Sequence, residues 1–422
     1  MKKIPLLVWI IVAIIGGILI GAFTPGLISS INDALGTAIP KDFIVQLFVS
    51  FSTIFSAFLS FAIPLIIIGF IVPGIGSLAK GAGKLLGTTV GLAYTSSVTA
   101  GFLAVTVAHF LYPIILQGQQ LTAFENPEEA LSAGYLEFTL DPIMSVMSAL
   151  ILAFIMGLGI TALNSTNMLN LFQDFQTIIE KLLGYVIIPL LPVHIVGVFA
   201  NMTMAGQVGQ ILAVFGKVFT MVILLHWVML AIQYTVAGTV SKRNPITMLR
   251  GMLPAYFTAI GTQSSAATIP VTVASAKKVG IRGKIADFAI PLCATIHLSG
   301  SMITITSCAV AVVYMASGSL SFSAMIPVVL VLGLMMVAAP GVPGGAVMTA
   351  IGLLQSMLGF DESMVALMIA LYLAQDSFGT ATNVTGDAAI AALTERVAKA
   401  TGADEEGLPE PQERDGGLAA AH

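Results

Sequence analysis

Long apolar runs separated by short polar stretches dominate the first 240 residues of this chain. They predict membrane-spanning helices at about 5–29, 43–73, 84–113, 142–164, 169–200 and 207–240. A helix needs about 20 apolar residues to cross a bilayer, and several of these runs are longer than that. We therefore expect some of the spans to be tilted.

Two later apolar stretches are interrupted by small polar residues, glycine and proline. The first, at 252–275, is broken at 261–270 and has basic residues on both flanks. The second, at about 321–360, is broken at 339–345 and has no positive charge on either side. Because positive charges mark the cytoplasmic side, each stretch is expected to begin and end on one side of the membrane. This predicts two re-entrant helical hairpins of opposite orientation, as in inverted-repeat transporters. Two proline-kinked spans are the alternative.

The last apolar run, at about 362–395, carries a stripe of polar residues. Its members are four, three and four positions apart, which places them on one face of a helix. They are Asp376, Thr380, Asn383 and Asp387. Ionisable residues inside a membrane usually mark a substrate or ion pathway, and oxygen ligands suit hard cations. We expect this face to line a binding site, although Asp387 could instead cap a water-exposed helix end.

Composition supports the same class of protein. Hydrophobic residues make up 57% of the 422 residues and charged residues only 9%, whereas soluble domains are about 25% charged. So few charges cannot cover a water-exposed surface. We therefore expect an all-α polytopic membrane protein with eight transmembrane helices plus the two hairpins. The net charge of −4 and the lack of a basic patch exclude a nucleic-acid-binding protein.

The few charges also predict the orientation of the chain. Lysine and arginine cluster at the expected cytoplasmic ends of the helices, whereas the segment 112–141 holds acidic residues and no lysine or arginine. We expect that segment to be an extracytoplasmic loop and both termini to be cytoplasmic. No lysine or arginine occurs between Lys284 and Arg396. A bound cation or a proton must therefore balance the two acids of the polar stripe.

Two other kinds of protein could place acids inside a membrane. An intramembrane aspartyl enzyme needs two carboxylates that share a proton, but eleven residues of helix separate Asp376 and Asp387 by about 16 Å. We therefore do not expect an enzyme. A channel is the stronger rival, since a polar stripe can line a pore. Two opposed hairpins fit an occluded site better than an open path.

Three motifs, taken in order, resemble those of the dicarboxylate/amino acid:cation symporters, a family that includes glutamate transporters and bacterial serine/threonine symporters. The runs are Ser-Ser-Ala-Ala-Thr-Ile-Pro at 264–270, Gly-Val-Pro-Gly at 341–344 and Asn-Val-Thr-Gly-Asp at 383–387. The resemblance extends from the first helix to about residue 400. It implies a homotrimer in a plasma membrane, here a bacterial inner membrane, in which each protomer moves its substrate by an elevator mechanism.

The resemblance also implies a division of the chain into two parts. A fixed scaffold would comprise helices 1 and 2 at 1–73 and helices 4 and 5 at 142–200. The mobile transport domain would comprise helix 3 at 84–117 and the segment 207–400, which holds helices 6 to 8 and both hairpins. The acidic, Gly/Ala/Pro-rich tail at 401–422 is expected to be disordered.

Roles for individual residues follow from the resemblance. Asp376 would bind the α-amino group of an amino acid, and Thr380 and Asn383 would line the same pocket. The substrate carboxylate would meet backbone near Ser264, Ser265, Gly341 and Val342. Sodium would be held by Asp387 and Asn383 with backbone carbonyls near Cys293.

The chain departs from the family at positions that select the substrate. Family members that carry acidic amino acids have an arginine three residues after the amino-binding aspartate, whereas this chain has Gly379, and Gln263 stands where another arginine can occur. A second substrate carboxylate would lack a fixed partner. We therefore predict a cation-coupled symporter of a small neutral amino acid such as serine, threonine or alanine. A proton-coupled carrier of acidic amino acids or dicarboxylates is the alternative.

A further departure concerns the coupling ions. Where glutamate carriers read Asn-Met-Asp-Gly-Thr, this chain reads His-Leu-Ser-Gly-Ser at 297–301, so the family's aspartate is replaced by Ser299. In the family that aspartate belongs to a further sodium site, so fewer sodium sites are expected here. His297 has two interpretations: a neutral, hydrogen-bonded core histidine, or a protonated residue that takes part in proton coupling.

Overall fold

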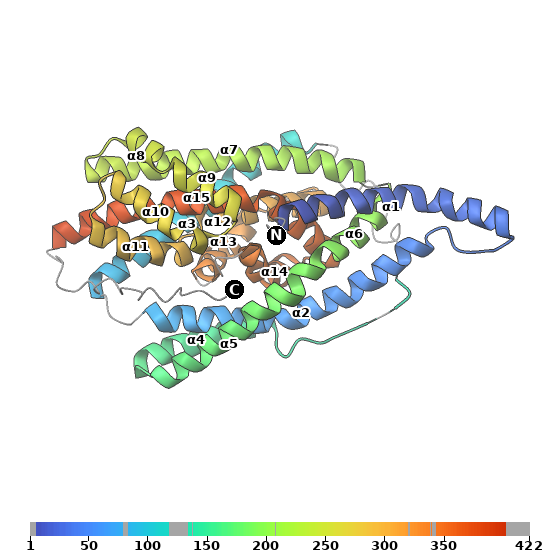
Figure 1. The fold of residues 1–422 in the computed structure, drawn as a ribbon, viewed down its shortest axis with the longest axis horizontal. Helices are drawn as coiled ribbons and strands as arrows, with labels where there is room; N and C mark the ends of the chain where they lie inside the picture. Colours follow the sequence, from blue (N-terminus) through green and yellow to red (C-terminus); the bar gives the residue numbers. More distant parts are fainter. Residues whose placement is uncertain are drawn as a thin grey trace, which may run out of the picture.

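The computed structural model describes residues 6–78, 83–117, 134–136, 138–206, 208–319, 321–337, 339 and 343–401. Within these residues the regular structure is helical (Figure 1). Most of the expected extracytoplasmic loop, part of the second hairpin turn and the tail from residue 402 lie outside the described residues.

The expected spans of the first half form as helices. They are α1 (Leu6–Leu35), α2 (Phe43–Leu78), α3 (Gly83–Ile115), α4 (Val146–Leu163), α5 (Thr166–Leu182), η2 (Leu183–Ile187), α6 (Ile188–Met204) and α7 (Val208–Ser241). Helix α4 begins four residues later than predicted, because the Ser145 hydroxyl accepts the Ser148 N–H and caps the helix there. The helix predicted at 169–200 extends over 166–204 and contains the π-helical turn η2.

The two interrupted stretches form pairs of helices that pack against each other. The first pair is α9 (Leu253–Thr262) and α10 (Ser265–Lys278), preceded by the short α8 (Pro245–Gly251). The turn passes through Gln263, whose backbone is left-handed with φ 52°, and Ser264 then caps α10. The second pair is α13 (Phe322–Met336) and α14 (Gly345–Leu358). In both pairs the chain turns back at the break.

A third break interrupts the helix that follows the first pair. Helix α11 (Gly283–Ile296) ends at His297, whose backbone is extended, and α12 (Ser299–Ser317) begins two residues later. Seven helical segments of the described residues are long and apolar enough to cross a membrane, and the combined segment Gly283–Ser317 is one of them. The break lies in the interior, because both His297 and Ser299 are buried.

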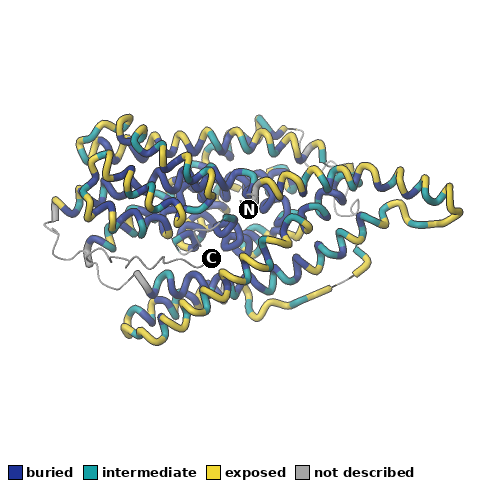
Figure 2. Tube along the Cα trace, in the orientation of Figure 1, coloured by how far each residue is buried: buried dark blue, intermediate teal, exposed yellow. Residues whose placement is uncertain are grey.

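Helices α12 and α15 (Glu362–Thr401) form the centre of one group of helices. Helix α12 packs against α3, α7 and α15, and α15 also packs against α9, α10 and α11. A second group consists of α1, α2, α4, α5 and α6. Figure 1 shows α1 and α2 extending past the other helices at one end of the molecule. Figure 2 shows that exposed residues follow the outer helices while the centre is buried.

Glycines bring α12 and α15 into close contact. A Cβ atom added to Gly300 would collide with the carbonyl oxygen of Gly379 and would lie 2.7 Å from Cβ of Thr382. Heavy atoms do not approach so closely, so the crossing requires glycine at position 300. This close approach places the polar stripe of α15 directly beside the break between α11 and α12.

A buried carboxylate holds one end of α15 to two loops. Glu395 has a side chain only 3% exposed, and it lies 2.7 Å from Nη2 of Arg243 and 3.1 Å from Nε of Arg282. Arg243 follows α7 and Arg282 precedes α11, so one carboxylate ties both segments to α15. Three partly exposed cations, with Lys399 at 3.6 Å, compensate the cost of burying this acid.

We expect replacement of Gly300 by alanine to destabilise the protein by about 1–3 kcal/mol, the usual cost of overpacking a core. Thermal unfolding of the purified protein in detergent measures the effect. Gly216→Ala is the matched control, because a Cβ there meets no atom within 4 Å and alanine favours a helix. Equal melting temperatures for the two variants would contradict the close approach of α12 and α15.

Candidate functional site

The predicted polar stripe lies on one helix and is buried along its whole length. Asp376, Thr380, Asn383 and Asp387 all belong to α15, and each is at most 5% exposed. In an apolar interior, every one of these groups needs a hydrogen-bond partner or an opposite charge. The partners divide the stripe into an upper part around Asp376 and a lower part around Asp387.

Asp376 contacts the second helix pair. Its Oδ2 accepts the backbone N–H of Gly344 at 2.8 Å, directly before α14 begins. Gly344 has φ 74°, a left-handed conformation that favours glycine. The side chains of Tyr372 and Thr380 also interact electrostatically with Asp376. A carboxylate has about four acceptor positions, so Asp376 retains capacity for a ligand N–H.

The first helix pair reaches the neighbouring residue of α15. Nε2 of Gln263, in the turn between α9 and α10, donates to Oγ of Ser377 at 2.7 Å. The two pairs therefore contact α15 at consecutive positions, 376 and 377. Their turns converge on one place in the interior, although α9 and α14 are far apart in the sequence.

Of the four residues predicted to meet the substrate carboxylate, the structure describes two. Ser264 caps α10 through its hydroxyl, which accepts the Ala267 N–H at 3.2 Å, and Ser265 is buried in the first turn of that helix. Both follow Gln263 in the sequence, and Gln263 contacts Ser377 beside the upper part of the stripe. Gly341 and Val342 lie outside the described residues.

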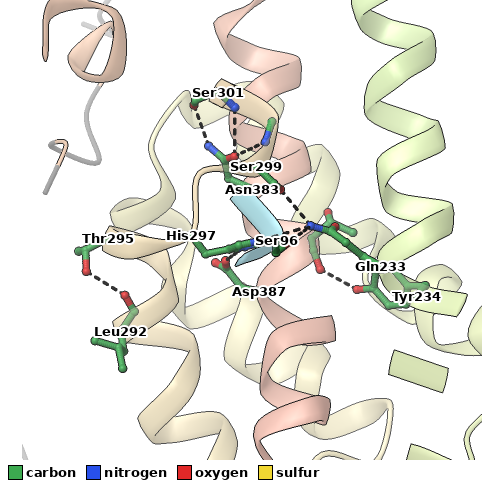
Figure 3. A network of polar contacts seen from close by, with 12 residues as sticks. Ser96, Gln233, Tyr234, Leu292, Thr295, His297, Ser299, Ser301, Asn383 and Asp387 are labelled. Atoms are coloured by element: carbon green, nitrogen blue, oxygen red, sulfur yellow. Dashed lines mark hydrogen bonds and ion pairs between the residues drawn. The ribbon is translucent and has the colours of Figure 1, made fainter. Parts of the chain in front are cut away.

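Asn383 connects α15 to the beginning of α12. Its Oδ1 accepts the backbone N–H groups of Gly300 at 2.7 Å and Ser301 at 3.2 Å, and its Nδ2 donates to Oγ of Ser301 at 3.0 Å (Figure 3). The first N–H groups of a helix lack partners within it, and here a side chain of another helix supplies the acceptor. Asn383 is therefore a cap for α12, a role that the sequence pattern did not reveal.

Asp387 pairs with the histidine at the helix break. Nδ1 of His297 lies 3.0 Å from Oδ1 of Asp387, and both side chains are buried. Figure 3 shows the two side chains pointing toward each other. Cys293, one turn before the break, is buried and interacts electrostatically with Asp387. Asp387 is thus an interior group and not a cap at a water-exposed helix end.

Three further polar residues surround His297. Nε2 of Gln233 in α7 lies 2.9 Å from Oγ of Ser96, 3.0 Å from Oγ of Ser299 and 3.2 Å from Nε2 of His297. Oγ of Ser96 lies 3.0 Å from the same histidine nitrogen. Sequence reasoning missed Gln233, although an amide in the middle of an apolar helix is a signal that could have found it.

The surroundings of Asp387 are rich in oxygen atoms, which suit a hard cation. The end of α11 carries the negative end of the helix dipole, and α11 packs against α15, the helix that carries Asp387. The described residues contain no cluster of three or more His, Cys, Asp or Glu side chains that could hold a metal ion. Oxygen atoms of the backbone and one carboxylate are ligands for a hard cation.

Asp376 has no basic partner in the described part of the chain. Lys277 pairs with Asp287, whereas Arg243, Arg282 and Lys399 pair with Glu395. The sequence has no lysine or arginine from 285 to 395. A buried carboxylate without a cation is costly, so the upper site favours a ligand that brings a positive charge.

Comparison with known proteins gives one family match. Residues 6–397 match the sodium:dicarboxylate symporter family. The serine/threonine transporter SstT of Streptococcus suis is 28% identical over 326 residues, which cover 74% of this chain and 89% of that protein. SstT of Streptococcus agalactiae is 25% identical over 378 residues, covering 86% and 92%. Excitatory amino acid transporter 1 of Homo sapiens is 28% identical over 207 residues, covering 49% and 38%.

We expect Asn383→Leu to lower the free energy of unfolding by about 2–4 kcal/mol, because two buried N–H groups lose their acceptor. Asn244→Ala is the control, since Asn244 caps the exposed beginning of α8 and its loss should cost about 1 kcal/mol. Thermal unfolding in detergent compares the two. A smaller loss of unfolding free energy for Asn383→Leu than for Asn244→Ala would show that the cap of α12 does not stabilise the protein.

Proposed function

The chain belongs to the sodium:dicarboxylate symporter family, and on that premise we propose that it carries a small neutral amino acid together with sodium ions. Serine, threonine and alanine are the proposed substrates. The family consists of transporters and not of enzymes, and the long apolar helices make the chain a multi-pass membrane protein.

One observation carries the choice of substrate. Asp376 is a buried carboxylate between the turns of two helix pairs, and no lysine or arginine is available in 285–395 to neutralise it. The α-ammonium group of an amino acid would supply the missing charge. A second carboxylate on the substrate would have no basic side chain to meet it, which favours a neutral side chain.

The packing around Gly379 supports the same choice. Members of the family that carry acidic amino acids have arginine at this position. Here a Cβ at 379 would lie 3.3 Å from Oγ1 of Thr304 and 3.6 Å from the carbonyl carbon of Gly300. Any side chain at 379 would therefore begin in tight contact with the Thr304 hydroxyl. The resemblance to two serine/threonine transporters over most of their length agrees with a neutral substrate.

We assign the remaining roles within this proposal. Asp376 holds the substrate amino group and Thr380 and Asn383 line the pocket, while backbone near Ser264, Ser265, Gly341 and Val342 meets the substrate carboxylate. Broken-helix N-termini attract anions, which suits the two turns for that task. Sodium is bound by Asp387 with carbonyl oxygens of Cys293 and Asn383.

In the proposed mechanism, one group of helices moves relative to the other. The group of α1, α2, α4, α5 and α6 is the fixed scaffold, and the helices around α12 and α15 are the transport domain. The shorter helix α4 also spans the membrane, in addition to the seven long helical segments, which gives eight spans. The pairs α9–α10 and α13–α14 are hairpins that enter the membrane from opposite sides. Three copies form a trimer in a bacterial inner membrane, with both termini in the cytoplasm.

Uptake into proteoliposomes tests substrate and coupling together. We expect labelled serine to accumulate when sodium is outside, and we expect excess aspartate to compete poorly. Strong aspartate uptake that excess serine does not reduce would overturn the substrate assignment. Serine uptake unchanged when choline replaces sodium would overturn sodium coupling and leave proton coupling as the alternative.

A single substitution tests the role of Asp376. Asp376→Asn keeps the size of the side chain but removes the charge that holds the substrate amino group, so serine uptake should fall by at least about 100-fold. Asp287→Asn is the control, because Asp287 forms an exposed ion pair with Lys277 and its loss should leave uptake unchanged. Wild-type uptake by Asp376→Asn would contradict the proposed site.

A further inference from the structure

We propose that Gln233, Ser96 and Ser299 are positioning residues for the coupling ion. Through His297 they fix the carboxylate of Asp387 in the orientation that binds sodium. The inference rests on the proposed function, since it assumes that Asp387 is a sodium ligand. None of the three residues needs to touch the ion.

Hydrogen-bond chemistry determines where the proton of His297 lies. An amide nitrogen only donates, and Nε2 of Gln233 faces the hydroxyl oxygens of Ser96 and Ser299. The Ser96 hydroxyl accepts one amide hydrogen and can donate its own hydrogen to Nε2 of His297, 3.0 Å away. Nδ1 of His297 faces the Asp387 carboxylate, which only accepts, and Nε2 faces the amide nitrogen of Gln233, which only donates. The ring therefore carries its hydrogen on Nδ1.

That hydrogen is directed at the ion site. Nδ1 of His297 lies 3.0 Å from Oδ1 of Asp387, so the N–H donates to this oxygen (Figure 3). A donor on one oxygen fixes the rotation of the carboxylate and leaves its other oxygen unengaged by the histidine. Partners of this kind orient metal ligands in many proteins, and their loss typically weakens metal binding about 10–100-fold.

Ser96, Gln233, Ser299, His297 and Asp387 form a chain of hydrogen bonds that we call the relay. Close packing keeps the relay in place. A Cβ atom at Gly386, the residue before Asp387, would lie 2.7 Å from both Oε1 of Gln233 and Cε1 of His297. The backbone of α15 therefore lies directly against both side chains. Gln233, His297 and Ser299 are all buried, so water does not compete for their hydrogen bonds. The relay joins four helices, since Ser96 is in α3, Gln233 in α7, Ser299 in α12 and Asp387 in α15.

The relay also has a cost. Oε1 of Gln233 is buried and has no hydrogen-bond partner. A buried acceptor without a donor costs about 1–3 kcal/mol. Leucine would fill nearly the same volume without that cost. Oε1 of Gln375 is also buried without a partner, so the effect on sodium activation and not this cost distinguishes the two amides.

The test compares sodium activation of serine uptake in proteoliposomes for three variants. Gln233→Leu and Ser96→Ala break the relay at different points, and Ser96→Ala removes only one oxygen. Both should raise the sodium concentration for half-maximal uptake about 10-fold or more. The maximal rate at saturating sodium, and the serine affinity measured there, should stay within about twofold of wild type. A merely structural role would lower the maximal rate instead.

The third variant, Gln375→Leu, is the matched control. Gln375 is a buried amide of α15 that bonds to Cys308 and Leu371 and has no bond to the relay. Its sodium activation should equal that of wild type. Wild-type sodium activation in both Gln233→Leu and Ser96→Ala would overturn the inference.

The variant Asp387→Asn tests the sodium site separately from the relay. If Asp387→Asn weakens sodium activation while the relay variants do not, the relay is wrong and the sodium site stands. If Asp387→Asn leaves sodium activation unchanged, the sodium site itself is wrong. Sodium-dependent shifts in melting temperature of the purified variants provide the same comparison without transport.

Discussion

The structure depends on the cost of burying two carboxylates in an apolar interior that offers them no lysine or arginine. Asp376 and Asp387 lie on the same helix, α15, and each is almost fully buried. Hydrogen bonds reduce the cost of burial but do not cancel the charge. In the proposed function, this remaining negative charge favours binding of the substrate ammonium group at Asp376 and of a cation at Asp387.

Helix ends supply the rest of the site, and three breaks bring them into the interior. The turns at Gln263 and Gly344 contact α15 at adjacent residues, while the break at His297 places the end of α11 and the beginning of α12 beside Asn383 and Asp387. Irregular backbone in a membrane must be buried or must line a cavity. Here each break has side chains of α15 or α7 as hydrogen-bond partners.

Much of the fold follows from the sequence because its signals are local. Long apolar runs indicated the helices, and the Gly/Pro/Ser interruptions marked both helix pairs to within a few residues. The spacing of Asp376, Thr380, Asn383 and Asp387 placed them on one helix face. The sequence did not reveal the relay around Gln233, because Ser96, Gln233, His297 and Asp387 come from distant segments and no local pattern relates them.

By itself the sequence determined the class of protein, since 9% charge can only suit a chain surrounded by lipid, and it placed both critical acids. Only the tertiary structure decided what each polar group does. Asn383 proved to cap α12, and Asp387 proved to share its oxygen with His297, because α12 and α15 approach at Gly300. Hydrogen bonds act over about 3 Å, so a group's role is fixed only when its neighbours are in place.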